Sequence, residues 1–321
     1  MALKHSTTVT GTNDAGKQVS LTAWNADHAF DSDGVVVPFA SATPAAPASG
    51  SLRLFVKKFA ERLLPAIIGP SGNDATLQPH ISRNKVSRWN PPGVVTTVPG
   101  VDGIGALTFV GTSVARTVAS TNILTRMLRL GCPSAAATAG SLASARAPNA
   151  MWTTGNGSGL GGFFFHTRFA TSDAAAVTGA RAFHGLSSNT SAATNVDPAT
   201  LTNSIGMAQI STDATQWYLV YGGSAAQTAI ALGTGLGAPT LITTCFELTL
   251  YAPPSLNGVI YYSAVNLGTN VNVSGTITPG TPGTQTPAST TFLTTQNWRT
   301  NNATALAVAF DLVSIYVETD Q

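Results

Sequence analysis

The sequence predicts an all-β protein whose main part is an antiparallel β-sandwich. From about residue 100 onward, short apolar runs rich in aromatic and β-branched residues recur at fairly regular spacing, separated by Gly, Pro, Asn or Ser. The 321 residues include 31 glycines and 18 prolines, a composition that suits many tight turns. A chain of this length can also bury a sizeable core.

Residues 1–50 are predicted to form an extended segment outside the sandwich. Residues 17–22 alternate between polar and apolar side chains, as a short strand does, and the sequence DSDG at 31–34 predicts a turn. Residues 40–51 are rich in Ala, Ser, Pro and Thr, which is typical of a linker and marks the clearest domain boundary. Because short polar strands cannot bury an apolar face alone, we expect several copies to associate here.

Residues 51–100 are predicted to form a small β module or stalk. Residues 52–68 predict two strands around a tight reversal at residues 62–65. Residues 77–92 predict a further extended segment that ends at a Pro-Pro-Gly sequence. The sequence leaves open whether this region folds independently or belongs to the sandwich.

Residues 101–321 are predicted to form the sandwich itself. Residues 122–130 have apolar side chains at i, i+4 and i+7, so a short helix and a strand fit equally well. Residues 275–287 contain two Pro-Gly pairs and predict a loop. The predicted strands lie within 162–169, 181–186, 204–210, 216–221, 246–251, 259–265, 291–293 and 305–317.

Charge and cysteine content exclude several classes of protein. Only 9% of residues are charged and the net charge is +2, so the chain lacks the basic field of a nucleic-acid-binding protein. Its apolar runs are far shorter than the roughly 18 residues that span a membrane, and its start has no apolar signal region. We therefore expect synthesis in a cytosol. Cys132 and Cys245 have no metal-ligand spacing and are predicted to be buried, without a disulfide, metal or cofactor.

The few charges are also unevenly distributed along the chain. Residues 201–321 contain one Lys or Arg against five Asp or Glu, whereas residues 1–100 contain nine against six. The C-terminal part must therefore be covered by Ser, Thr, Asn, Gln and Gly, or by neighbouring copies of itself. Such a surface is typical of proteins that assemble.

No catalytic motif stands out. Hydrolysis of a polysaccharide would need two carboxylates placed together, and no spacing pairs any of the five available in the sandwich. Ser158 lies in a Gly-rich run without the strand and helix of a nucleophile elbow, so that run predicts a turn. His166 and His184 occur in aromatic strands and are predicted to be structural. The carboxylates are Asp173, Asp197, Asp213, Glu247 and Asp311.

Tryptophans are the candidate ligand contacts, because an exposed indole ring can stack on a sugar ring. Trp152 lies beside the Gly-rich residues 153–162, and Trp298 lies in the polar sequence QNWRTNN. Of Trp217 and Tyr218, one is expected in the core. Trp152, Trp217 and Trp298 are therefore predicted as glycan-binding residues, against the alternative that strand aromatics are buried.

Residues 19–28 have the sequence VSLTAWNADH, and several short motifs follow along the chain. These motifs are RLLP (62–65), GPSG (69–72), LQP (77–79), NKV (84–86), WNP (89–91), RAFHGL (181–186) and YVET (316–319). Together they make the sequence resemble bacteriophage virion proteins of the tail-fibre or receptor-binding type. Residues 19–28 are similar to the segment V-x-x-x-A-W-N-x-D-H that opens many such proteins, and the similarity extends over nearly the whole chain. It implies a non-enzymatic homotrimer with a lectin-like sandwich of the concanavalin-like or jelly-roll class. It also implies attachment to other virion proteins through Trp24, Asn25, Asp27 and His28.

Three functions follow from this resemblance. The first is attachment to a host through a cell-surface glycan, and the second is a purely structural role as a head or collar fibre or decoration. The third, less favoured, is that of a tailspike that degrades polysaccharide. All three place the chain in a virion assembled in the bacterial cytoplasm, with the tail favoured over the head.

Overall fold

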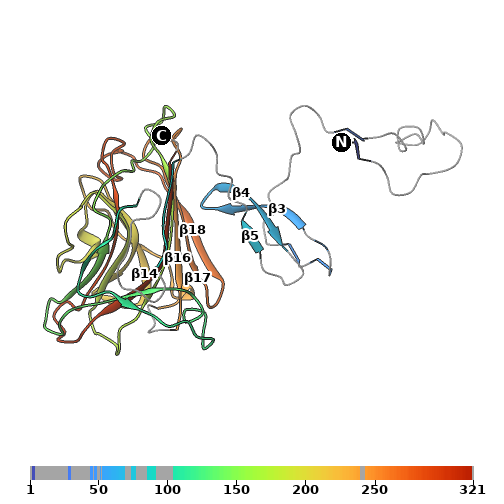
Figure 1. Cartoon of the computed structure of the whole chain (residues 1–321). Helices are drawn as coiled ribbons and strands as arrows, with labels where there is room; N and C mark the ends of the chain where they lie inside the picture. The colour runs from blue at the N-terminus through green and yellow to red at the C-terminus, as the bar shows by residue number, and fades with distance from the viewer. Residues whose placement is uncertain are drawn as a thin grey trace, which may run out of the picture. The chain divides into compact units, whose positions relative to one another are not determined.

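The computed structural model describes residues 2–3, 28–29, 44–45, 47–48, 51, 53–68, 74–76, 85–91, 104–238 and 243–319 (Figure 1). The chain divides into two compact units. One comprises Met1–Lys58 and Leu63–Leu77, and the other comprises Phe59–Arg62 and Gln78–Gln321. Within the described residues no helix is long and apolar enough to cross a membrane.

The smaller unit contains short antiparallel strands. Strand β1 (Ala2–Leu3) pairs with β2 (His28–Ala29). A second sheet has the order β3 (Arg53–Phe59), β4 (Arg62–Ile68) and β5 (Asp74–Thr76).

The reversal predicted at residues 62–65 is wrong, because the chain turns at Ala60 and Glu61. Their φ angles are 45° and 67°, and a two-residue turn with positive φ at both positions matches the twist of the flanking strands. Strand β4 then continues through Pro65, with Leu64 and Ala66 buried on one face.

The larger unit is a sandwich of two antiparallel sheets, so the predicted all-β antiparallel sandwich is confirmed (Figure 1). The seven-stranded sheet has the order β15 (Ile230–Ala231), β14 (Asp213–Gly222), β13 (Ser204–Ile210), β12 (Arg181–Ser187), β19 (Thr294–Thr300), β10 (Leu142–Arg146) and β7 (Thr108–Val110). The eight-stranded sheet has the order β18 (Val271–Ile277), β17 (Ile260–Asn266), β16 (Phe246–Ala252), β11 (Phe163–Thr171), β20 (Ala309–Thr319), β9 (Leu130–Pro133) and β8 (Val114–Ala115), and β6 (Lys85–Trp89) also pairs with β20.

The core lies between the sheets and is built from side chains that alternate between the two faces of each strand. In β16, Phe246 and Leu248 point into the core while Glu247 points away from it. A β-bulge opposite Arg168 and Phe169 changes the phase of β20, so the core-facing residues shift within that strand. The core-facing residues of β20 are Phe310, Leu312, Ile315 and Val317.

Strand β6 lies within residues 51–100 but belongs to the eight-stranded sheet. It pairs with the C-terminal half of β20, and Trp89 is completely buried in the core. The sandwich therefore includes residues that precede position 101.

Residues 121–127 are neither helix nor strand but a series of turns, and β9 begins only at Leu130. Asn122 and Thr125 stabilise the turn reciprocally. The Thr125 N–H donates to Asn122 Oδ1 at 2.9 Å, and the Asn122 N–H donates to Thr125 Oγ1 at 3.0 Å. Local side-chain bonds of this kind compete with regular structure. In the predicted loop at 275–287, β18 continues to Ile277 before the loop starts.

Candidate functional site

A cavity of about 320 Å³ opens on the outer face of the seven-stranded sheet. Strands β12, β13 and β19 form its floor, and the connection from β12 to β13, residues 188–203, forms its rim. The floor residues are Phe183, Ser187, Ser204, Gln296 and Trp298, and the exposed rim residues are Asn189, Thr194, Val196, Thr200 and Thr202.

The floor residues lie together because they are opposite one another on paired strands. Phe183 of β12 lies opposite Trp298 of β19, and their rings stack with centroids 6.0 Å apart. Ser187 of β12 lies opposite Ser204 of β13, with their hydroxyl oxygens 2.8 Å apart. The two aromatic rings belong to a second hydrophobic cluster, separate from the main core, that includes Ala193 of the rim segment.

Side-chain hydrogen bonds hold the first half of the rim segment against the sheet. Gln296 Nε2 donates to the carbonyl oxygens of Asn189 and Ser191, the latter at 3.0 Å. Arg146 Nε donates to the Thr190 carbonyl oxygen at 3.0 Å.

The second half of the rim segment is fixed by Asp197, which precedes the short 3₁₀ helix η1 (Pro198–Thr200). Its carboxylate accepts from the Ala199 N–H at 3.0 Å and from Ser211 Oγ at 2.8 Å. Arg181 Nε lies 3.6 Å from the same carboxylate. The cavity therefore has an ordered rim.

The side chains that line the cavity are uncharged. Its polar lining consists of Ser and Thr hydroxyls and of Asn and Gln amides, and none of the described residues that line it is ionisable. Hydroxyls both donate and accept hydrogen bonds, and amides do the same. Such a lining suits an uncharged ligand with many hydroxyl groups.

The expected exposed tryptophan rings are absent. Trp152, Trp217 and Trp298 are 2%, 0% and 1% exposed, so the exposed rings that the stacking prediction assumed are not found at these three residues, and a glycan-binding role for them stays a prediction. Trp152 and Trp217 belong to the main core, and Trp298 lies under the cavity. Tyr218, by contrast, is partly exposed, as expected for one member of the Trp217 and Tyr218 pair.

The predicted attachment residues lie largely outside the described parts of the chain. Trp24, Asn25 and Asp27 are outside them. His28 is described only through its backbone, which pairs with Leu3 in the strands β1 and β2. Their role in attachment stays a prediction.

Each carboxylate considered for catalysis has its own set of partners. Asp173 pairs with Arg299, Asp197 with Arg181, and Glu247 with Arg168 and His166. Asp213 accepts from Tyr218 Oη at 2.6 Å and from Thr215 and Gln216, and these hydrogen bonds lower its pKa.

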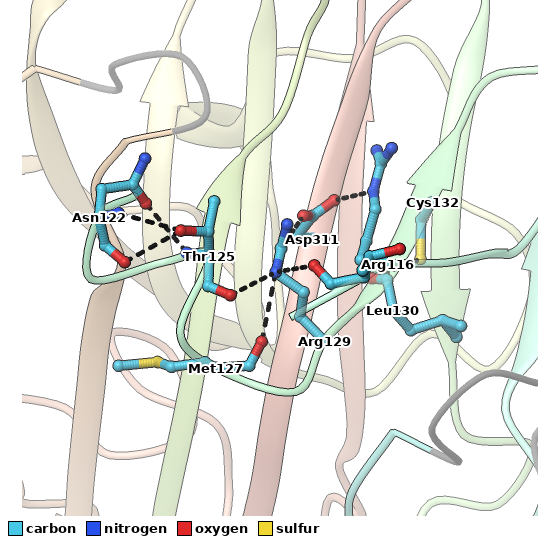
Figure 2. A network of polar contacts seen from close by, with 9 residues as sticks. Arg116, Asn122, Thr125, Met127, Arg129, Leu130, Cys132 and Asp311 are labelled. Atoms are coloured by element: carbon cyan, nitrogen blue, oxygen red, sulfur yellow. Dashed lines mark hydrogen bonds and ion pairs between the residues drawn. The ribbon is translucent and has the colours of Figure 1, made fainter. Parts of the chain in front are cut away.

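Asp311 shows most clearly what these carboxylates do (Figure 2). It is buried in β20 and accepts from Arg129 Nε at 2.9 Å and from Arg116 Nε at 3.2 Å. Arg129 Nη1 in turn donates to the carbonyl oxygens of Thr125 and Met127, each at 3.3 Å. The carboxylate thereby ties the turns at 121–127 to the sheet.

Both histidines have the structural settings that we expected. His166 Nδ1 lies 3.0 Å from Thr249 Oγ1, on the outer face of the eight-stranded sheet. His184 is buried in the core, where its ring stacks on Phe169 at 3.8 Å and its Nδ1 lies 3.2 Å from Asn297 Oδ1. Burial lowers the pKa of His184 to about 3, so its ring is neutral in the folded protein.

The two cysteines are buried and unbridged, as predicted. Burial raises the pKa of Cys245 to about 12 and that of Cys132 well above its ordinary value, so both are thiols at neutral pH. Within the described residues, no group of three or more His, Cys, Asp or Glu side chains could hold a metal ion.

The connection between β12 and β13 carries a compositional signal for the cavity. Eleven of the eighteen residues from 187 to 204 are Ser, Thr or Asn. This density lies between two predicted strands and could have drawn attention to the connection. What it could not reveal is that the connection folds back over the sheet, because that depends on contacts with β10 and β19.

Comparison with protein-family models and with curated protein sequences gives no match. Among solved structures, the chain is similar to arcelin-5, a lectin-like defence protein from Phaseolus vulgaris (10% identity, TM-score 0.44, 73% of this chain and 98% of that chain). It is also similar to lectin UEA-II complexed with galactose (10%, 0.47, 74% and 98%) and to a protein of unknown function from Shewanella oneidensis MR-1 (11%, 0.44, 76% and 90%). Likenesses this distant carry no argument about ligand or activity.

Proposed function

We propose that this chain is a non-enzymatic component of a bacteriophage particle that binds a neutral glycan of the host surface. The observation that carries the proposal is the uncharged cavity on the seven-stranded sheet, with a buried floor and an exposed rim of hydroxyl and amide groups. The phage context comes from the resemblance of residues 17–28 and of the later motifs to tail-fibre proteins.

Three properties of the cavity support a sugar as the ligand. Its volume of about 320 Å³ lies at the lower end of the range of small-molecule sites, about 300–1,000 Å³, which suits a short saccharide. Its lining can donate and accept hydrogen bonds without charge, as a neutral sugar requires. Its rim is held by side chains of the sheet, so little ordering is needed on binding.

The remaining parts of the proposal concern assembly. Residues 1–50 would attach three copies to other virion proteins, through Trp24, Asn25, Asp27 and His28, and the sandwich would face outward from the tail. Chemical cross-linking of the full chain tests this arrangement, since a monomer would contradict it.

The glycan site is tested by blocking the cavity. The full-length protein would be screened on an array of neutral and acidic bacterial glycans, and hits would be measured by titration calorimetry. Thr194→Trp places an indole at the exposed rim and should lower the affinity at least tenfold. Thr269→Trp is the matched control on an exposed turn of the other sheet and should bind as the unmodified protein does.

Two outcomes would overturn the glycan site: no binding to any glycan, or equal binding by the Thr194→Trp and control proteins. Immunogold labelling of phage particles then separates the alternatives. Label at the distal tail favours host attachment, whereas label on the head or collar without glycan binding favours the structural role.

The tailspike alternative has its own test. Every carboxylate considered above is bonded to arginine or to hydroxyl and amide donors, so each already has partners within the fold. Incubation with the bound polysaccharide should therefore release no smaller products.

A further inference from the structure

The outer strands of the two sandwich sheets differ in length and in charge. Strands β15 and β8 have two residues each and β7 has three, so these edges offer little backbone for pairing. Strand β6 has five residues but carries Lys85 and Arg88. Short strands and charged side chains are the usual ways in which proteins protect a sheet edge.

Strand β18 lacks both protections. It has seven residues, Val271–Ile277, with the sequence VNVSGTI and no charge. It pairs along its whole length with β17, and the one other hydrogen bond described for its backbone is from the Val271 N–H to Thr269 Oγ1, at 3.5 Å. One side of its backbone is therefore open among the described residues.

The side chains of β18 alternate between the two faces of the sheet. Asn272, Ser274 and Thr276 are exposed on the outer face, while Val273 and Ile277 pack against the sandwich core. An added strand with the same alternation would extend both faces of the sheet without a mismatch.

We propose that β18 pairs antiparallel with β18 of a second copy of this chain, about a two-fold axis at Ser274. In this register Ser274 lies opposite itself, Asn272 opposite Thr276, and Val273 opposite Gly275. Polar side chains thus meet polar ones, and core-facing positions meet core-facing ones. The two eight-stranded sheets become one continuous sheet.

The absence of charge favours a second copy over a different partner. A two-fold contact is isologous, so a charge at the axial position 274 would face its own copy, and Ser274 is uncharged. Neither β18 nor its neighbour β17, with the sequence IYYSAVN, carries a charged residue. The contact lies on the eight-stranded sheet and leaves the cavity of the other sheet open. Resting on the trimer proposed above, which residues 1–50 hold together, a two-fold contact between sandwiches joins one trimer to a second and brings the glycan sites of both together.

A cysteine cross-link tests the register directly. Residues directly opposite in an antiparallel pair have Cα atoms about 4.5–5.5 Å apart, a separation that a disulfide can bridge. Full-length Ser274→Cys should therefore form disulfide-linked pairs of chains on mild oxidation, seen on a non-reducing gel. Cys132 and Cys245 are buried and should add no background.

The matched control is Ser120→Cys, an exposed serine in the loop after β8, on the other side of the same sheet. It should remain as single chains under the same conditions. Single chains from a folded Ser274→Cys protein, or equal cross-linking of both variants, would overturn the proposal.

A second experiment separates self-pairing from capture of another strand. Ser274→Lys and Ser274→Glu should each abolish the pairing, because like charges meet at the axis. A mixture of the two variants should restore it, as a mixed pair detected by native mass spectrometry. Failure of the mixture to pair would contradict a two-fold contact, whether or not the cavity binds a glycan.

Discussion

The cavity of the seven-stranded sheet and the ion-paired sites of the sandwich use polar residues in different ways. The cavity is lined by hydroxyls, amides and two stacked rings, and its described lining has no ionisable group. The ion pairs instead join segments far apart in the chain, such as Arg299 with Asp173 and Arg129 with Asp311. In a protein with only 9% charged residues, these charged side chains thus join distant segments of the fold, while the described lining of the cavity contains none.

Breaking a buried ion pair should have the largest effect. Arg299 and Asp173 are 3% and 0% exposed, so Arg299→Met leaves a buried carboxylate without its counter-charge. We expect a loss of about 3–5 kcal/mol in the free energy of unfolding, measured in urea. Arg126→Met, at an exposed arginine, is the matched control and should change stability little. A loss below about 1 kcal/mol, as for a surface pair, would show that this ion pair does not hold the sheets.

The buried imidazole should make stability depend on pH. His184 has a pKa of about 3 in the folded protein and 6.5 in the unfolded chain, so between these values only the unfolded state takes up a proton. Stability should therefore fall as the pH falls below 6.5, by about 1.4 kcal/mol per pH unit.

The variant His184→Phe keeps a ring on Phe169 and should lose this dependence. The comparison is made by urea unfolding between pH 6.5 and 4.5. Glu247, whose pKa is lowered from 4.5 to about 2 in the folded protein, adds a pH dependence near pH 4.5 that is the same in both proteins and cancels in the comparison. Parallel stability curves for the two proteins would contradict a neutral, buried His184.

Loosening the rim should affect binding more than stability. Gln296→Ala removes the donor to the carbonyl oxygens of Asn189 and Ser191, and a neutral hydrogen bond contributes about 0.5–1.5 kcal/mol. We expect faster hydrogen exchange in residues 188–203 and at least a tenfold loss of glycan affinity. Unchanged exchange would show that the other anchors suffice.

The smallest effect is expected from one rim hydroxyl. Thr202 is exposed at the cavity, so Thr202→Ala should leave the melting temperature unchanged and weaken glycan binding about two- to tenfold. Calorimetric titration at constant salt measures it. A change in stability without a change in affinity would assign Thr202 to the fold instead of the ligand.

Local patterns in the sequence were enough to predict the fold class and several side-chain settings. Alternation along β16 places Phe246 and Leu248 inside and Glu247 outside, because side-chain direction in a strand has a period of two. The burial of Cys132 and Cys245 followed from their isolation from any metal or disulfide pattern. These features depend on near neighbours in the chain.

The tertiary structure alone decided which outward-facing residues are covered. Trp298 points away from the main core, as its place in β19 requires, yet residues 188–203 fold over it and bury it. The anchors of that cover come from Gln296 and Arg146, about 105 and 44 residues away in sequence. Alternation identifies two faces of a strand, but only contacts between distant segments determine whether a face meets solvent, a loop or a second copy.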